Sequence, residues 1–61
     1  MEHLRELRKQ NGMTLGALGK KVGVSLKTIF NYETGKRKPN IEMLRKLAKA
    51  LDCTIGDLLG E

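Results

Sequence analysis

Apolar residues recur along the chain at intervals of three and four, and alternation of apolar with polar residues is nearly absent. This spacing predicts helices rather than strands. The first helix carries Leu4 and Leu7 and ends at Asn11-Gly12, where glycine suits a left-handed C-cap. Four more stretches each follow a residue whose side chain favours a helix N-terminus. They run from Thr14 to Gly23, from Ser25 to Gly35, from Asn40 to the Asp52-Cys53 turn, and onward from Thr54, which with Asp57 is close to a capping box.

Each of these helices is too short to be stable alone in water, so all are expected to share one core. We therefore expect a compact all-α fold of five helices, with residues 1–61 forming a single domain. The apolar positions predicted to form the core are Leu4, Leu7, Leu18, Val22, Val24, Ile29, Tyr32, Ile41, Leu44, Leu47, Leu51, Ile55 and Leu58.

The charge of the chain is concentrated in one segment. The chain has a net charge of +5, and the segment from Lys20 to Lys38 contains six basic residues and a single acid, Glu33, so it accounts for the whole excess. A basic patch confined to one region is typical of a protein that binds a polyanion. A solvated, solubilising surface is the alternative explanation.

Composition argues against several other classes of protein. With one Cys and one His, the chain has neither an internal disulfide nor a Cys/His zinc site, and we expect no metal or cofactor. Cys53 is interpreted as a small buried apolar residue. No apolar run approaches the ~20 residues of a membrane span and no signal peptide is visible, so we expect a cytoplasmic protein without a membrane partner. Paired carboxylates, a Cys/His dyad and a phosphate-binding glycine loop are also missing, which argues against an enzyme or a small-molecule substrate.

The second and third helices are joined by the short connection Val22-Gly23-Val24-Ser25. A turn of this length forces a steep crossing, as in a helix-turn-helix unit. Gly19 supplies the small residue needed where the third helix passes close to the second, and Gly23 tolerates positive φ. The third helix is expected to pack by a narrow stripe, Ile29 and Tyr32, which leaves its other side free to project outward.

With these features the chain resembles the lambda-repressor-like, or Cro-type, helix-turn-helix domains of bacterial and phage regulators. The likeness runs from about Leu4 to Leu59, with the helix-turn-helix unit at about 14–34. It implies a five-helix domain whose third helix, about 26–33, enters the major groove of operator DNA, usually as a homodimer on a two-fold-related site. The residues that carry the resemblance are Met13-Thr14, Leu18, Gly23-Val24-Ser25, Ile29, the stretch from Tyr32 to Lys36, Pro39, and Leu44 through Leu51.

The chain departs from the family pattern in its second helix. Many members carry Gln at the first position, where the amide binds a backbone phosphate, but this chain has Leu15. Gly19 stands where Ala is usual, and Gly16 is a second interior glycine. Each costs roughly 1 kcal/mol relative to Ala, so this helix is expected to be the least stable of the five.

The outward side of the third helix is expected to carry the DNA contacts. The resemblance places Leu26, Lys27 and Asn31 at positions that touch base edges, with Thr28 at the margin of the same side. Asn pairs with adenine, Lys donates to guanine acceptors, and an apolar group packs on a thymine methyl. Phe30 is either a contact of this kind or part of the core or of a protein interface.

Other residues are expected to hold the DNA backbone or the fold. Ser25 and Thr14, besides capping their helices, lie where a hydroxyl approaches phosphate. Lys36 and Lys38, in the loop after the third helix, are the expected phosphate clamps, with a merely solvated loop as the alternative.

In the family, a Glu at the position of Glu33 commonly pairs with an Arg at the position of Arg8. This pair would neutralise the acid within the basic segment and tie the first helix to the third. The alternative is a solvated Glu33, with Arg8 free to reach a phosphate.

Two functions follow from these expectations. The first is sequence-specific binding of double-stranded DNA by a prokaryotic or phage transcriptional regulator, with repression as its expected action. The second is a protein-interaction module of the same fold, such as an antitoxin-like or adaptor subunit. The second would use Phe30 and the leucines near the C-terminus as its contact surface. Leu59, with Ile55 or Met43, would alternatively form a small dimer patch.

Overall fold

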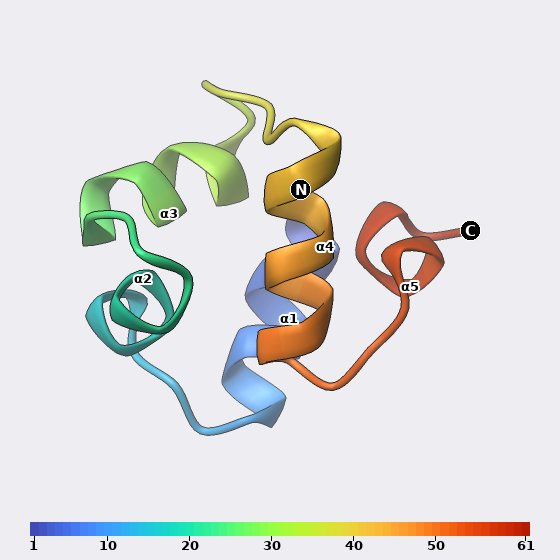
Figure 1. Cartoon of the computed structure of the whole chain (residues 1–61), viewed down its shortest axis with the longest axis horizontal. Coiled ribbons are helices and arrows are strands. Elements are labelled where there is room, and N and C mark those ends of the chain that lie inside the picture. Colours follow the sequence, from blue (N-terminus) through green and yellow to red (C-terminus); the bar gives the residue numbers. More distant parts are fainter.

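Five α-helices follow one another in the computed structural model, which describes the backbone of residues 1–61 and every side chain except that of Glu2. All of the described secondary structure is helical, in agreement with the predicted all-α class (Figure 1). The helices are α1 (Glu2–Gln10), α2 (Leu15–Val22), α3 (Leu26–Thr34), α4 (Ile41–Ala50) and α5 (Ile55–Leu59).

The structure confirms the four helix starts that were predicted from their N-cap residues. Each start is held by a local hydrogen bond. The side chains of Thr14, Ser25, Asn40 and Thr54 all accept a bond from the backbone N–H three residues later, at 2.8–3.2 Å. The carboxylate of Asp57 in turn accepts a bond from the N–H of Thr54 at 3.0 Å, which completes the capping box. The backbone bond and then the side-chain bond to Thr54 hold the pKa of Asp57 below its ordinary value.

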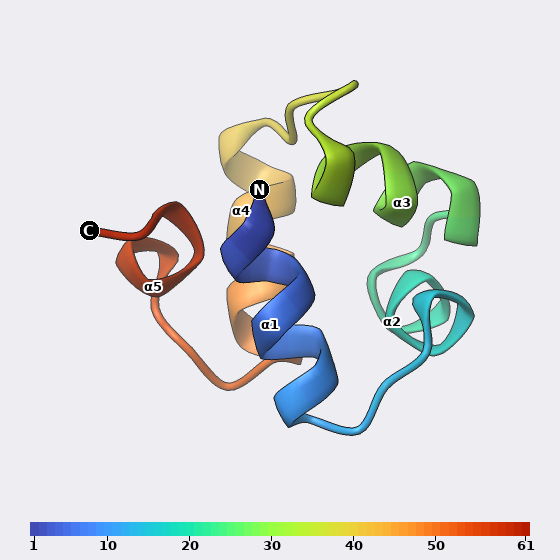
Figure 2. The same ribbon diagram turned by 180° about the vertical axis from the view of Figure 1, so that it is seen from behind.

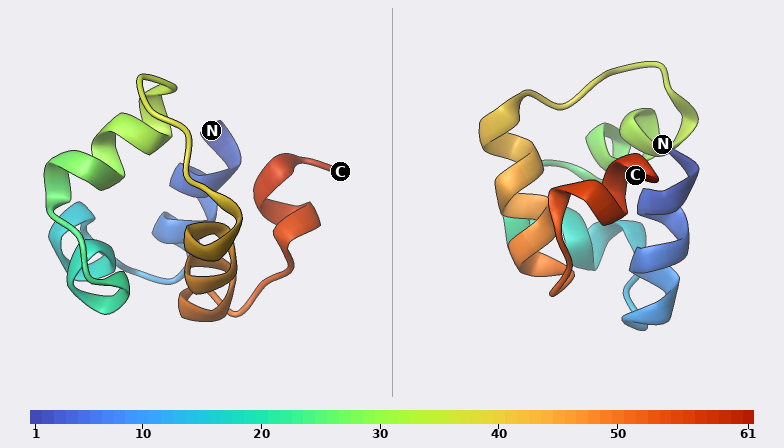
Figure 3. Two further views of the ribbon diagram at one scale, coloured as in Figure 1. Left: turned by 45° about the horizontal axis from the view of Figure 1, so that its top comes forward. Right: turned by 90° about the vertical axis from the view of Figure 1, so that its right-hand side faces the viewer.

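The helices surround one core as a closed ring. Each helix packs mainly against two others, in the cyclic order α2, α3, α1, α5, α4 and back to α2. Figures 1 and 2 show α2 and α3 together at one end of the molecule and α5 at the other, while Figure 3 shows α1 and α4 on opposite sides of α5. The helix-turn-helix pair therefore forms one end of the domain.

One side chain from each helix occupies the centre of this ring. Leu4, Leu18, Ile29, Leu47 and Leu58 come from α1 to α5 in turn, and none is more than 1% exposed. Since each helix contributes one of these side chains, detaching any helix would expose the core to solvent.

Of the other predicted core residues, half are buried, namely Val22, Tyr32, Leu44 and Leu51. Leu7, Val24 and Ile55 are only partly buried and pack on the edge of the core. Ile41 is 61% exposed, so its assignment to the core was wrong. It is the first residue of α4, and this turn extends past the edge of the core, which Leu44 reaches one turn later.

Cys53 is partly buried, and burial followed by the nearby carboxylates raises the pKa of its thiol. Within the described residues no group of three His, Cys, Asp or Glu side chains is placed to hold a metal ion. None of the described helices is long and apolar enough to cross a membrane.

Candidate nucleic-acid interface

The crossing of α2 and α3 is fixed by a close backbone contact at Gly19. A Cβ atom on Gly19 would lie 2.6 Å from the carbonyl oxygen of Val24, nearer than a real Cβ approaches. The N–H of Val24 donates to the carbonyl oxygen of Gly19 at 2.8 Å, and Gly23 has a φ of 84°. The predicted need for a small residue at Gly19 and a left-handed one at Gly23 is thus confirmed, and together they set the angle at which α3 leaves the turn. The expectation that Gly19 lowers stability relative to Ala is wrong, because the added Cβ would meet this backbone.

The inner side of α3 is locked in place by buried side chains. Ile29, Tyr32 and Glu33 are all buried, at 0, 4 and 9% exposure. At the end of the helix, the Met1 amino group donates to the carbonyl oxygens of Tyr32 and Glu33 at 3.2 and 3.3 Å. The helix is therefore held from within between Ile29 and its C-terminal end, which presents its outer side in a fixed orientation.

The outer side of α3 carries the residues predicted to contact bases. Lys27 is exposed and Asn31 is half-buried, and their spacing of four residues puts them on one face. The side-chain amide of Asn31 makes no hydrogen bond within the described part of the chain. Its oxygen and nitrogen are not fully buried, so the amide reaches solvent. Leu26 and Phe30 are 58 and 46% exposed, which places two large apolar groups beside this polar pair.

The residues predicted to contact the DNA backbone lie around α3. Ser25 is at its start, where its hydroxyl lies 3.1 Å from that of the half-buried Thr28. Lys36 and Lys38 are exposed in the loop after Gly35. Thr14 is exposed at the start of α2 and is followed directly by Leu15, which lies beside α3 in a cleft described below.

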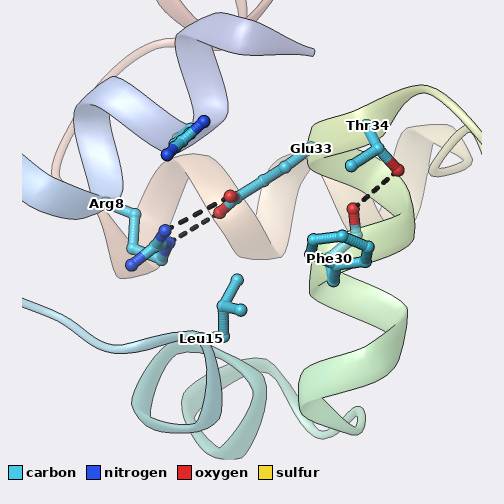
Figure 4. Close-up of a pocket in the computed structure, with 6 residues that line it drawn as sticks. Arg8, Leu15, Phe30, Glu33 and Thr34 are labelled. Carbon is cyan, nitrogen blue, oxygen red and sulfur yellow. Dashed lines mark hydrogen bonds and ion pairs between the residues drawn. The ribbon is translucent and has the colours of Figure 1, made fainter.

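Arg8 and Glu33 form a buried ion pair between α1 and α3 (Figure 4). The Arg8 Nε and Nη2 groups donate to the two carboxylate oxygens of Glu33 at 2.6 and 3.3 Å, and Nη1 donates to the carbonyl oxygen of Met13 at 2.8 Å. The two side chains are only 10 and 5% exposed. The acid within the basic segment is thus turned inward and neutralised, and Arg8 is committed to the fold.

A cleft of about 470 Å³ lies over this ion pair, at the junction of α1, α2 and α3. Its lining residues are Arg5, Arg8, Leu15, Phe30, Glu33 and Thr34, most of which are labelled in Figure 4. Arg5 was not among the predicted site residues. Its spacing of three residues from Arg8 is the one signal in the sequence that the two share a face of α1, and only the packing of α1 on α3 brings that face to the interface.

Comparison with known proteins agrees with this geometry. The model of the helix-turn-helix family matches residues 4–58. The chain is 37% identical over 60 residues to the HTH-type transcriptional regulator AnsR of Bacillus subtilis, covering 98% of this chain and 52% of that protein. It is 42% identical over 55 residues to an HTH-type transcriptional regulator of Archaeoglobus fulgidus, covering 90 and 79%. The chain thus spans about half the length of the first of these relatives and most of the second.

A solved structure is similar over nearly the whole chain. The nuclear magnetic resonance structure of the DNA-binding domain of the P22 C2 repressor superposes with a TM-score of 0.90 at 43% identity, covering 95% of this chain and 76% of that one. Because the fold, the helix-turn-helix geometry and the family match coincide over residues 4–58, the chain belongs to the lambda-repressor-like helix-turn-helix family.

Proposed function

We propose that this chain binds double-stranded DNA sequence-specifically as part of a transcriptional regulator, and that it acts as a repressor. The observation that carries the proposal is the presentation of Lys27 and Asn31 on one solvent-facing side of α3, within the basic segment and with the single acid of that segment paired inward. The likeness to a repressor DNA-binding domain supports it. No catalytic step is part of this role, and it places the protein in the cytoplasm with the DNA.

In this proposal α3 enters the major groove and reads base edges. Asn31 pairs with adenine through its amide and Lys27 donates to guanine O6 or N7. Leu26 and Phe30 pack on thymine methyls or sugars, which accounts for their exposure on an otherwise polar side. Thr28 lies at the edge of this surface, where it is half-buried and its hydroxyl is 3.1 Å from that of Ser25.

The residues around α3 fix its register on the duplex. The helix start at Ser25, the α2 start at Thr14, and Lys36 and Lys38 each contact a phosphate, which adds affinity without reading sequence. Two copies of the chain then bind a two-fold-related operator as a homodimer. Leu59, 47% exposed beside the half-buried Pro39, offers an apolar contact for the second copy.

A titration over a range of salt concentrations separates this function from a protein-interaction module that uses the exposed Phe30 and Leu59. Fluorescence anisotropy of a labelled duplex measures the affinity between about 50 and 200 mM KCl. Binding through phosphates predicts that log affinity falls linearly and steeply with log salt, because condensed counterions are released. Absent or salt-independent binding to DNA would contradict the proposal and favour an apolar protein interface.

A further inference from the structure

We propose that the hollow between the end of α2 and the second half of α4 is a docking site for an acidic segment of a partner protein, in which carboxylates flank an apolar side chain. The hollow has a volume of about 350 Å³, and its lining residues are Lys21, Lys46, Lys49 and Ala50. This role goes beyond the proposed function, because none of these residues takes part in the proposed DNA interface.

The three lysines of the hollow have no anionic partner among the described side chains. All three are exposed, and the one ion pair that the described side chains form is that of Arg8 with Glu33. Asp52 and Asp57 line a neighbouring hollow together with Lys49, and neither of them forms an ion pair with it. The three ammonium groups are therefore available to an external anion.

Helix stability explains only part of this cluster of lysines. Lys21 and Lys49 lie in the last turns of α2 and α4, where a cation interacts favourably with the helix dipole. Lys46 lies before the last turn of α4, so the dipole does not account for it. Its spacing of three residues from Lys49 places the two side chains on one face of α4, and the packing of α2 on α4 adds Lys21 from a distant part of the sequence.

The chemistry of the lining defines the ligand. A lysine ammonium group donates three hydrogen bonds and accepts none, so the ligand must supply several anionic acceptors. Ala50 contributes an apolar surface that is 9% exposed, and the CH₂ stems of the lysines extend it. A peptide segment with an apolar side chain between carboxylates satisfies both parts of the lining, whereas a small inorganic anion would leave the apolar part uncovered.

The hollow lies at the far ends of α2 and α4 from the proposed DNA contacts. Those contacts are at Thr14, before α2, and at Lys38, in the loop before α4. Lys21 is ~10 Å along α2 from Thr14, and Lys49 is ~13 Å along α4 from its N-cap Asn40, at 1.5 Å per residue. In Figure 1, α4 runs down from this loop and its last turn is at the bottom of the helix. An operator bound by α3 therefore leaves the hollow open, which favours a protein rather than DNA as its occupant.

The test titrates a short synthetic peptide, in which two acidic residues stand on each side of a leucine, into the isotope-labelled chain. Nuclear magnetic resonance then follows the backbone amide shifts. The peptide should shift amides in the last turn of α2 and the second half of α4, with a dissociation constant below about 1 mM. A peptide with Gln in place of its acidic residues should cause no shift, and one with Ser in place of the leucine should bind more weakly.

Two double variants remove the same charge at different places. Lys46→Gln with Lys49→Gln should weaken peptide binding by roughly 2- to 30-fold in about 0.1 M salt, the effect of losing two surface ion pairs. It should leave the salt slope of duplex binding unchanged. Lys36→Gln with Lys38→Gln should flatten that slope by about 1.8 and change peptide affinity by less than about twofold, because salt screens charges that are distant from the hollow. All four side chains are exposed, so both variants should stay folded by circular dichroism.

Equal losses of peptide affinity in the two double variants, or peptide-induced shifts outside the hollow, would overturn the docking site. The absence of saturable shifts with the acidic peptide would also overturn it. Shifts of the hollow amides on addition of duplex DNA would identify a nucleic-acid contact instead. If the wild type bound the peptide at the hollow but did not bind DNA, the docking site would stand and the proposed function would fail.

Discussion

Replacing Glu33 with Ala tests the role of the buried ion pair. In the wild type, the two carboxylate oxygens of Glu33 accept from Arg8 at 2.6 and 3.3 Å, and the Arg8 side chain is 10% exposed. The substitution removes the carboxylate and leaves the guanidinium charge in the same buried place. In the described structure the Arg8 guanidinium then keeps one hydrogen-bond acceptor, the Met13 carbonyl oxygen.

The expected cost follows from that burial. Breaking a buried ion pair from one side costs about 3–5 kcal/mol, because the partner charge stays desolvated and uncompensated. A 61-residue domain has roughly 3–9 kcal/mol of total stability at typical values per residue. Glu33→Ala should therefore lower the melting temperature by about 15 °C or more and leave much of the protein unfolded at 37 °C.

Thermal and urea unfolding followed by circular dichroism measure this cost. Glu6→Ala, an exposed glutamate on α1, is the matched control and should change stability by less than about 0.5 kcal/mol. The double variant Arg8→Met with Glu33→Leu should recover most of the loss, because no charge remains buried. It should stay about 1 kcal/mol short of full recovery, since the Met13 carbonyl loses its donor. A Glu33→Ala variant as stable as Glu6→Ala, or a double variant no more stable than Glu33→Ala, would show that the buried Arg8 charge does not depend on Glu33 for its compensation.

Three other predictions concern a helix, a cap and a phosphate contact. Gly16→Ala should raise the free energy of unfolding by about 1 kcal/mol, since no atom lies within 4 Å of the added Cβ. Gly19→Ala should lower it, because the added Cβ would lie 2.6 Å from the Val24 carbonyl oxygen. Thermal unfolding of both variants measures the two changes. Because its pKa is lowered in the fold, Asp57 contributes stability that is complete above its ordinary pKa of 3.8 and is lost as the pH falls through the lowered value. Urea titrations from about pH 6 to pH 2 should show this loss in the wild type and less of it in Asp57→Asn. Lys38→Ala should weaken binding to all duplexes alike and flatten the salt slope by about one unit; a change in base preference would contradict a backbone role.

The helices could be predicted from the sequence because their ends depend on local chemistry. Ser25 and Asn40 cap the helices that follow them by bonds to residues three positions away, so no distant contact is needed to place those boundaries. The small residue at Gly19 was predictable for a related reason, since a short turn forces two backbones together close to that position.

The errors and omissions concern features that depend on how the helices pack. Ile41 has the spacing of a core residue, but periodicity along a helix does not tell where the core stops, and the first turn of α4 lies beyond it. Arg5 shares a face with Arg8, and the sequence does not reveal that this face meets α2 and α3 around a cleft. The role of Phe30 stays a prediction, because its exposure suits both a DNA contact and a protein contact.

Lys27 and Asn31 together are proposed to face the base edges of a DNA major groove, and selection of bound sequences from a random duplex pool shows whether they do. Wild type and Asn31→Ala are carried through the same selection and their consensus sequences are compared. The wild type should yield a two-fold-related consensus, and the variant should lose preference at one position of each half-site, with a cost of about 1–3 kcal/mol there. An unchanged consensus bound with unchanged affinity by Asn31→Ala would contradict this placement of the two side chains.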